Sequence, residues 1–219
     1  MANLPPEVYH LAEAANWPPI QRRGLLPAAT LIGDAGLTPA EQDRLQRSQR
    51  TDHTVLDNGI EIRDQRPMPA AALRRCLVDM SAEDWYQLIN SRVFFWLDVS
   101  RLNRQRAACG PRAQVVLTFD TAALITGYGK QAAVTAINSG NARRRPARRG
   151  AATFVPYPTW VESGWASEAA ALGITERKRS HPPAELTIAG PVPDALHYVR
   201  DITHLDSGED FAPASGRRT

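Results

Sequence analysis

Strand-forming segments are scattered among helical segments along this chain, without the regular alternation of strand and helix that builds a parallel sheet. The strongest strand candidates are residues 93–97, which are rich in aromatic side chains, and residues 114–119, which are rich in β-branched ones. Residues 99–108 between them have the character of a basic helix. Neither a Gly-x-Gly-x-x-Gly motif nor a phosphate-binding loop with Gly-Lys-Ser/Thr is present. The pattern predicts an α+β fold and excludes nucleotide binding by those two devices.

Length and composition predict one globular domain. The 219 residues suffice for a single well-packed core, and 43% hydrophobic and 22% charged residues are ordinary values for a globular protein. We assign residues 1–206 to this domain. Residues 207–219 are polar and contain glycine and proline, so we expect a flexible C-terminal tail there.

The chain is expected to be a cytoplasmic protein that does not associate with membranes. No apolar run is long enough to span a bilayer, and residues 1–7 lack the basic start of a signal peptide. Cys76 and Cys109 lie in dissimilar surroundings without metal-binding or redox spacing, which indicates two buried thiols. The later histidines also lack zinc spacing, so no metal site is expected; they are His53, His181, His197 and His204.

Local signals define several elements before any function is considered. Residues 7–11 read as a first strand, and Asn16 is suited to cap the helix that follows. Apolar spacing predicts helices over 70–79 and, after a Ser81 cap, over 82–90. Residues 63–65 are interpreted as a polar turn bound to the core, with the wall of an active site as the alternative.

Three separated segments are the most informative parts of the chain. The first pairs His10 on a strand with Asn16 six residues on, and continues with Ile20 and Gly24-Leu25-Leu26. The others are the aromatic run Phe94-Phe95-Trp96, and Pro183-Ala184-Glu185-Leu186 followed by Val192-Pro193. In this order the segments resemble the opening, the middle strand and the late strand of the DarT-type ADP-ribosyltransferases.

The resemblance implies that NAD is bound as a substrate in a cleft between two split antiparallel β-sheets with flanking helices. His10 would contact the adenosine-side ribose or a neighbouring phosphate, and Asn16 would hold the nicotinamide portion. Glu185 would bind a nicotinamide-ribose hydroxyl. Because positive charge develops on the sugar as nicotinamide departs, a carboxylate there stabilises the transition state more than the ground state. The same glutamate would also take a proton from the attacking group.

An arginine is expected near the pyrophosphate or the reacting sugar. Arg101 is the candidate for this catalytic role, although the family carries its arginine closer behind the aromatic run. Arg104 is the competing candidate, and a solvated basic helix face is the alternative for both. Phe94 or Trp96 would stack on nicotinamide, while strand alternation directs at least one of the three aromatic residues into the core.

An arginine-rich segment follows a polar loop at residues 138–141. Its guanidinium groups suit forked binding of phosphates, and Tyr157 and Trp160 nearby suit base stacking. Because DarT-type enzymes modify bases of single-stranded DNA, the resemblance implies DNA or RNA as acceptor and partner. A solvated loop or a site for an acidic protein is the alternative. The arginines are Arg143, Arg144, Arg145, Arg148 and Arg149.

The sequence therefore predicts an NAD-dependent ADP-ribosyltransferase that releases nicotinamide and modifies a nucleic-acid base. An NAD glycohydrolase on the same fold, with water as the acceptor, is one alternative. A non-catalytic nucleic-acid-binding protein on a degenerate transferase fold is another. The resemblance alone implies a toxin role, and the chain does not identify an antitoxin or immunity partner.

Overall fold

The computed structural model describes residues 4–213 and has mixed α and β structure around one large antiparallel sheet. In the described chain this sheet has seven strands, in the order β7 (Val155–Pro156), β6 (Ala132–Thr135), β8 (Glu185–Ala189), β4 (Arg92–Trp96), β1 (Glu7–Glu13), β5 (Gln114–Asp120) and β9 (Val199–Leu205). Every neighbouring pair is antiparallel. The prediction of antiparallel strands with flanking helices is confirmed.

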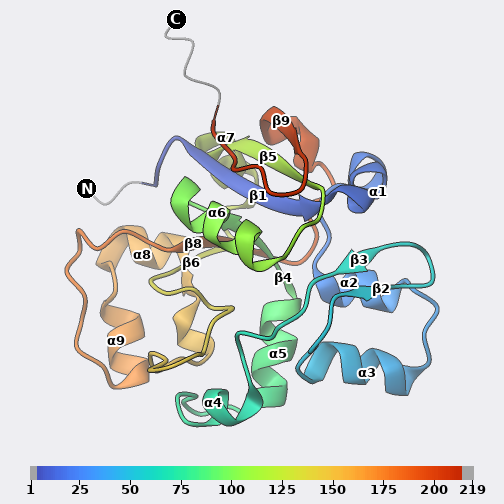
Figure 1. The fold of residues 1–219 in the computed structure, drawn as a ribbon. Coiled ribbons are helices and arrows are strands. Elements are labelled where there is room, and N and C mark those ends of the chain that lie inside the picture. The colour runs from blue at the N-terminus through green and yellow to red at the C-terminus, as the bar shows by residue number, and fades with distance from the viewer. Residues whose placement is uncertain (1–3, 214–219) are drawn as a thin grey trace, which may run out of the picture.

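The sheet consists of two halves that meet at a short junction. Among the described residues, β1 and β4 share one register pair, Tyr9 opposite Trp96, whereas β1 and β5 pair along their whole length. Trp96 also stands opposite Glu185, so the first residue of β8 lies one strand from the junction. Figure 1 shows β1, β5 and β9 in the upper part of the molecule and β4, β6 and β8 below them. The two split sheets implied by the resemblance correspond here to one sheet with two weakly joined halves.

Helices cover both faces of this sheet. One face packs Ile20, Leu124 and Trp160 against strand residues, and these come from α1 (Trp17–Arg23), α7 (Thr121–Tyr128) and α8 (Tyr157–Ser163). On the other face, Leu102 and Trp85 pack on the two halves, from α6 (Val99–Ala108) and α5 (Ala82–Asn90) respectively. The remaining helical elements outside the smaller unit described next are α4 (Ala70–Arg74), α9 (Ala166–Leu172), η1 (Ala14–Asn16), η2 (Ala151–Thr153) and η3 (Ala195–Tyr198). Within residues 4–213, no helix has the length and apolar character to cross a membrane.

A smaller unit with its own apolar cluster lies beside the sheet. It contains α2 (Ala28–Gly33), α3 (Pro39–Arg47), β2 (Thr54–Val55) and β3 (Glu61–Ile62). Its buried side chains include Ile32, Leu45, Leu56, Ile60 and Ile62. Residues 60–68 lead out of this unit, and we call them the strap; all of them except Arg66 line the cavity described below.

Two predicted boundaries are confirmed and one is wrong. Helices α5 and α6 span the predicted residues 82–90 and 99–108. Helix α4 ends at Arg74 instead of reaching residue 79. The reason is tertiary pairing: Arg149 N–H donates to the Cys76 carbonyl, and Val78 N–H donates to the Arg149 carbonyl. The chain leaves the helix to make this pairing.

One residue of the predicted C-terminal tail, Phe211, is anchored to the domain, and the other described residues from 207 to 213 are exposed. Phe211 is 2% exposed and lies against Tyr9, with ring centroids 5.4 Å apart. The Asn103 side chain both donates to the Phe211 carbonyl and accepts from the Phe211 N–H. The polar composition of the segment concealed one apolar anchor. The rest of the predicted tail, residues 214–219, lies outside the described residues.

Candidate functional site

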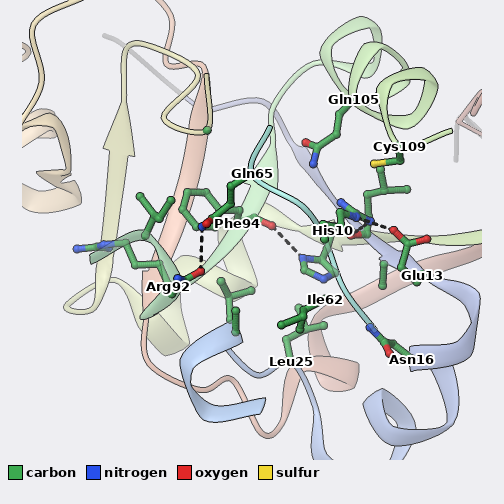
Figure 2. Close-up of a pocket in the computed structure, with 18 of the residues that line it drawn as sticks. His10, Glu13, Asn16, Leu25, Ile62, Gln65, Arg92, Phe94, Gln105 and Cys109 are labelled. Atoms are coloured by element: carbon green, nitrogen blue, oxygen red, sulfur yellow. Dashed lines mark hydrogen bonds and ion pairs between the residues drawn. The ribbon is translucent and has the colours of Figure 1, made fainter. Parts of the chain in front are cut away.

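A cavity of about 530 Å³ opens at the junction between the two sheet halves. Pockets that bind small molecules typically have about 300–1,000 Å³. Its walls come from β1, β4, the start of β8, α1, α6, the strap and the loop 138–141. Figure 2 shows the His10 ring near the centre of this cavity, with Gln105 of α6 and Cys109, the residue after α6, above it.

The structure brings the residues predicted for NAD together and leaves the arginine-rich segment outside the cavity lining. Those that line the cavity are His10, Asn16, Phe94, Trp96, Arg101 and Glu185. They come from both sheet halves and from two helices, so the sheet junction is what gathers them. Their environments decide which chemistry each is able to perform.

Glu185 is a buried carboxylate on the half of the sheet that holds β6 and β8. It is 4% exposed, and the Ser139 N–H donates to both of its oxygens at 3.2 Å. The Thr135 hydroxyl lies 3.0 Å from Oε2. Burial raises the pKa of Glu185 to about 6, and the bonds from Ser139 and Thr135 oppose that rise. The group is therefore ionised above mildly acidic pH and sits in a site that disfavours its charge.

His10 is a neutral histidine with a defined tautomer. Its Nδ1 lies 2.9 Å from the Phe94 carbonyl oxygen. Because a carbonyl oxygen only accepts, Nδ1 carries the proton and Nε2 is left as an acceptor. Burial lowers the pKa of His10 to about 4, so the ring stays neutral near physiological pH. His10 is thus built to accept a hydrogen bond from a hydroxyl and not to donate one to a phosphate.

The side chain of Asn16 binds the strap instead of capping α1. Its side chain makes no capping hydrogen bond to α1. Instead its Nδ2 donates to the Glu61 carbonyl at 2.8 Å, and its Oδ1 accepts from the Glu61 N–H at 2.9 Å. The amide thereby satisfies both backbone groups of a strap residue, as a neighbouring strand would. Asn16 ties the strap to the segment that follows β1, and it also lines the cavity. The role in holding nicotinamide that the resemblance implies stays a prediction.

The two aromatic candidates also differ in their surroundings. Trp96 is 8% exposed and packs with Tyr9 and Leu102 under α6, which makes it a core residue at the junction. Phe94 is only half-buried, and its ring meets Phe154 edge-on at 6.4 Å. Phe95, between them, is fully buried. Of the pair proposed for stacking, Phe94 is the one with accessible surface.

One face of α6 forms a basic rim of the cavity. Residues 101, 104, 105, 108 and 109 follow the spacing of a helix face, and all of them line the cavity. Arg101 and Arg104 are exposed on this rim, and the Arg104 guanidinium bonds to Ser100. Cys109 is half-buried there, which corrects the expectation of two buried thiols; Cys76 is buried as predicted. The rim offers positive charge to a ligand that enters past it.

The strap contributes cavity residues whose function the sequence did not reveal. Arg63 donates to Glu13 at 2.8 Å and to the Leu11 carbonyl at 2.8 Å. Burial alone would raise the pKa of Glu13, but the ion pairs with Arg63 and Arg112 outweigh it and lower that pKa. Residues 63–65 all line the cavity and do not form the polar turn predicted for them, so they are part of the cavity wall. The one sequence signal for this role was the position of Arg63, a charged residue directly after the alternating pattern of residues 60–62.

Arg50 is a second cavity residue that the sequence did not single out. It is buried, and its guanidinium donates to the Arg63 and Leu45 carbonyls and to the Asn90 side chain. Burial lowers its pKa to about 10, so it remains charged. No ion pair is formed by Arg50 within residues 4–213. Its positive charge is partly offset by that of Asp64, which also lines the cavity.

The arginine-rich segment is divided between surface and core. Four of its members are exposed: Arg143, Arg144, Arg145 and Arg148. Arg149 is 2% exposed and is therefore removed from the predicted nucleic-acid surface. Its guanidinium finds carbonyl acceptors and the face of Trp85, which compensate for its burial. The exposed arginines follow directly on Asn138–Asn141, which line the cavity.

Comparison with known proteins places the chain in a family without an assigned activity. The model of a family of unknown function (DUF7002) matches residues 6–199, and the chain belongs to that family. No curated protein and no solved structure matches it. In residues 4–213, histidine, cysteine, aspartate and glutamate side chains form no group of three or more that could hold a metal ion.

Proposed function

We propose that this member of the DUF7002 family is an NAD-dependent ADP-ribosyltransferase built on a DarT-like split-sheet fold. One observation carries the proposal: His10 and Glu185, which belong to opposite halves of the sheet, line the same cavity at the junction. Their chemistry is complementary, since one accepts from a hydroxyl and the other offers a buried carboxylate. A dinucleotide that spans the junction would meet both.

NAD would lie in the cavity with a ribose hydroxyl donating to Nε2 of His10. The neutral ring and its fixed tautomer favour a ribose over the phosphate alternative. The pyrophosphate would lie towards the positive charges of Arg50, Arg101 and Arg104. Phe94 is the aromatic residue with surface available for nicotinamide. The strap, fastened by Asn16, would close the cavity on the side opposite the sheet.

The reaction begins with cleavage of the bond between the ribose carbon and the nicotinamide nitrogen. The bonding electrons leave with nicotinamide, which becomes neutral, and the ribose becomes oxocarbenium-like. The ionised Glu185 stabilises this cation, an interaction absent from the ground state. The acceptor then forms a bond to the ribose carbon and loses a proton, which Glu185 takes. A pKa of about 6 suits a carboxylate that must be ionised first and protonated later.

A nucleic-acid base is the acceptor that we propose. Arg143, Arg144 and Arg145 are exposed and follow the cavity loop 138–141 in the chain, so phosphates bound there would hold a base near the cavity mouth. Transfer to water would make the protein an NAD glycohydrolase. A non-catalytic protein would use the same arginines for binding alone.

Product analysis tests the proposal. The protein is incubated with NAD and with single-stranded DNA, RNA or protein, and every fraction is examined by mass spectrometry. We expect nicotinamide and an adduct of ADP-ribose on nucleic acid, and neither product with Glu185→Gln. Free ADP-ribose without an adduct would refute transfer to these acceptors and show that the protein is an NAD glycohydrolase. Absence of nicotinamide with every acceptor would refute catalysis altogether.

A further inference from the structure

Arg149 is a buried arginine at the base of the loop 139–149. Its Nη1 donates to the Ser139 carbonyl at 3.2 Å, and its Nε donates to the Ala147 carbonyl at 3.2 Å. The guanidinium carbon lies 5.6 Å from the centre of the Trp85 ring. Arg149 forms no ion pair with an acidic side chain in residues 4–213. Its contacts offset the cost of burying the cation and fasten the guanidinium to the backbone of Ser139 and Ala147.

Ser139 links Arg149 to the candidate catalytic carboxylate. Its carbonyl accepts from Arg149, while its N–H donates to Glu185. Ser139 is itself buried. The two bonds fix the Ser139 backbone from both sides. A displacement of Arg149 would therefore move the Ser139 N–H relative to the Glu185 carboxylate.

The backbone of Arg149 is anchored independently of the exposed loop. Its N–H donates to the Cys76 carbonyl, and its own carbonyl accepts from the Val78 N–H, both at 2.8 Å. This pairing ties the end of the loop to the segment after α4. The side chain therefore starts from a fixed point when it reaches Ser139.

We propose that Arg149 is a positioning residue for Glu185, closing the base of the loop 139–149 and holding the Ser139 N–H on the Glu185 carboxylate. The inference rests on the proposed function for its catalytic meaning, but the contacts themselves do not depend on it. It assigns to Arg149 a different role from that of its exposed neighbours in the same segment.

Electrostatics gives the arrangement a measurable signature. Burial raises the pKa of Glu185, and the nearby charge of Arg149 is among the influences that lower it. Loss of that charge, together with loss of the hydrogen bond that keeps the Ser139 N–H in place on the carboxylate, should raise the pKa of Glu185 further. Thr135 and Ser139 are the other groups that act on Glu185, and neither is charged.

The test compares Arg149→Gln, which loses the charge, with Arg149→Lys, which keeps it. Glu185 is titrated by NMR with carboxyl-labelled glutamate, its signal being assigned by its loss in Glu185→Gln. We expect Arg149→Gln to raise the pKa of Glu185 by about one unit, a tenfold shift in its protonation equilibrium. Arg149→Lys should titrate close to wild type. In nicotinamide release, Arg149→Lys should lower kcat several-fold and leave KM for NAD nearly unchanged.

The matched control is Arg106→Met, since Arg106 is also buried and bonds to the Glu209 and Asp206 carbonyls and to Gln114. It should lower Tm without moving the titration of Glu185. A folded Arg149→Gln in which Glu185 titrates as in wild type would overturn the inference. If Arg149→Gln does not fold, an Arg149→Lys protein with unchanged kcat would overturn it. If the wild type releases no nicotinamide, the proposed function fails while the titration still decides the role of Arg149.

Discussion

The Thr135 hydroxyl lies between two acceptors, 3.0 Å from Oε2 of Glu185 and 2.6 Å from the Ile137 carbonyl oxygen. A hydroxyl has one proton, so it serves only one of them at a time. When Glu185 is protonated, the acid can donate to Thr135 while Thr135 donates to Ile137. When Glu185 is ionised, the hydroxyl can donate to the carboxylate instead, which favours the charged form. The hydrogen bonding around Glu185 thus changes with its protonation state.

Thr135→Val is expected to raise the pKa of Glu185. The bond to an ionised carboxylate is roughly twice as strong as a neutral one, so its loss disfavours the charged form. The acidic limb of the pH profile for nicotinamide release should move to higher pH, whereas Thr135→Ser, which keeps the hydroxyl, should not move it. A valine variant with the wild-type profile would show that the hydroxyl does not act on Glu185.

Glu185→Gln is expected to stabilise the protein while abolishing nicotinamide release. The folded pKa of Glu185 is about 6 and the ordinary value is 4.5, so the folded state binds more protons between these pH values. The wild type therefore loses stability as pH rises through this window, about 2 kcal/mol in all. Glutamine lacks this loss, so its Tm should exceed that of wild type at pH 8. The difference should shrink at pH 4.5, and a constant difference would contradict the assigned pKa.

Much of the secondary structure was predictable from local signals. The apolar spacing after Ser81 predicted α5 correctly, and the basic stretch at 99–108 predicted α6 correctly. Both predictions rest on periodicity and capping, which depend only on residues within one or two helical turns. Helix α4 was predicted too long because its end is decided by pairing between residue 149 and residues 76–78. The buried position of Phe211 was not predictable for a similar reason, since one apolar residue does not alter the polar composition of its segment.

The candidate site was predictable in membership but not in the role of each residue. His10 and Glu185 do reach one cavity, although no local pattern relates them. Whether a polar side chain faces a ligand depends on which backbone groups lie beside it. Asn16 donates a hydrogen bond to the Glu61 carbonyl, and Arg149 donates one to the Ser139 carbonyl. Neither partner lies close in sequence to the side chain that it binds. Nothing in the sequence of the arginine-rich segment distinguishes Arg149, which is buried, from the four arginines that are exposed.

His10→Phe is expected to weaken NAD binding and to flatten the dependence of stability on pH. The substitution removes the Nε2 acceptor, so KM for NAD should rise about tenfold, the equivalent of one lost hydrogen bond of about 1.4 kcal/mol. The folded pKa of His10 is about 4, below the ordinary 6.5, so its stability contribution is complete above pH 6.5 and declines as pH falls towards 4. This decline amounts to about 3 kcal/mol. Thermal unfolding of wild type and variant between pH 4 and 7 checks it, and parallel curves would contradict it.

Replacing Arg143, Arg144 and Arg145 by glutamine is expected to weaken binding of single-stranded nucleic acid. Each phosphate contact contributes about 0.7 to the slope of log affinity against log salt, so the slope should fall by about 2. The control removes the same charge elsewhere through Arg22→Gln, Arg44→Gln and Arg75→Gln, all at exposed positions. If the two triple variants had equal slopes of log affinity against log salt, binding would depend on the net charge of the protein and not on these three arginines.

Asn16→Ala is expected to loosen the strap without unfolding the sheet. The substitution frees both backbone groups of Glu61, so amides in residues 60–68 should exchange with solvent faster. Because the strap forms one wall of the cavity, KM for NAD should rise more than kcat falls. Asn103→Ala is a matched control, since Asn103 holds Phe211 through the same pair of bonds. It should speed exchange near residue 211 and leave KM unchanged. If Asn16→Ala instead lowered kcat alone, with the strap protected as in wild type, Asn16 would act on the reacting groups and not on the strap.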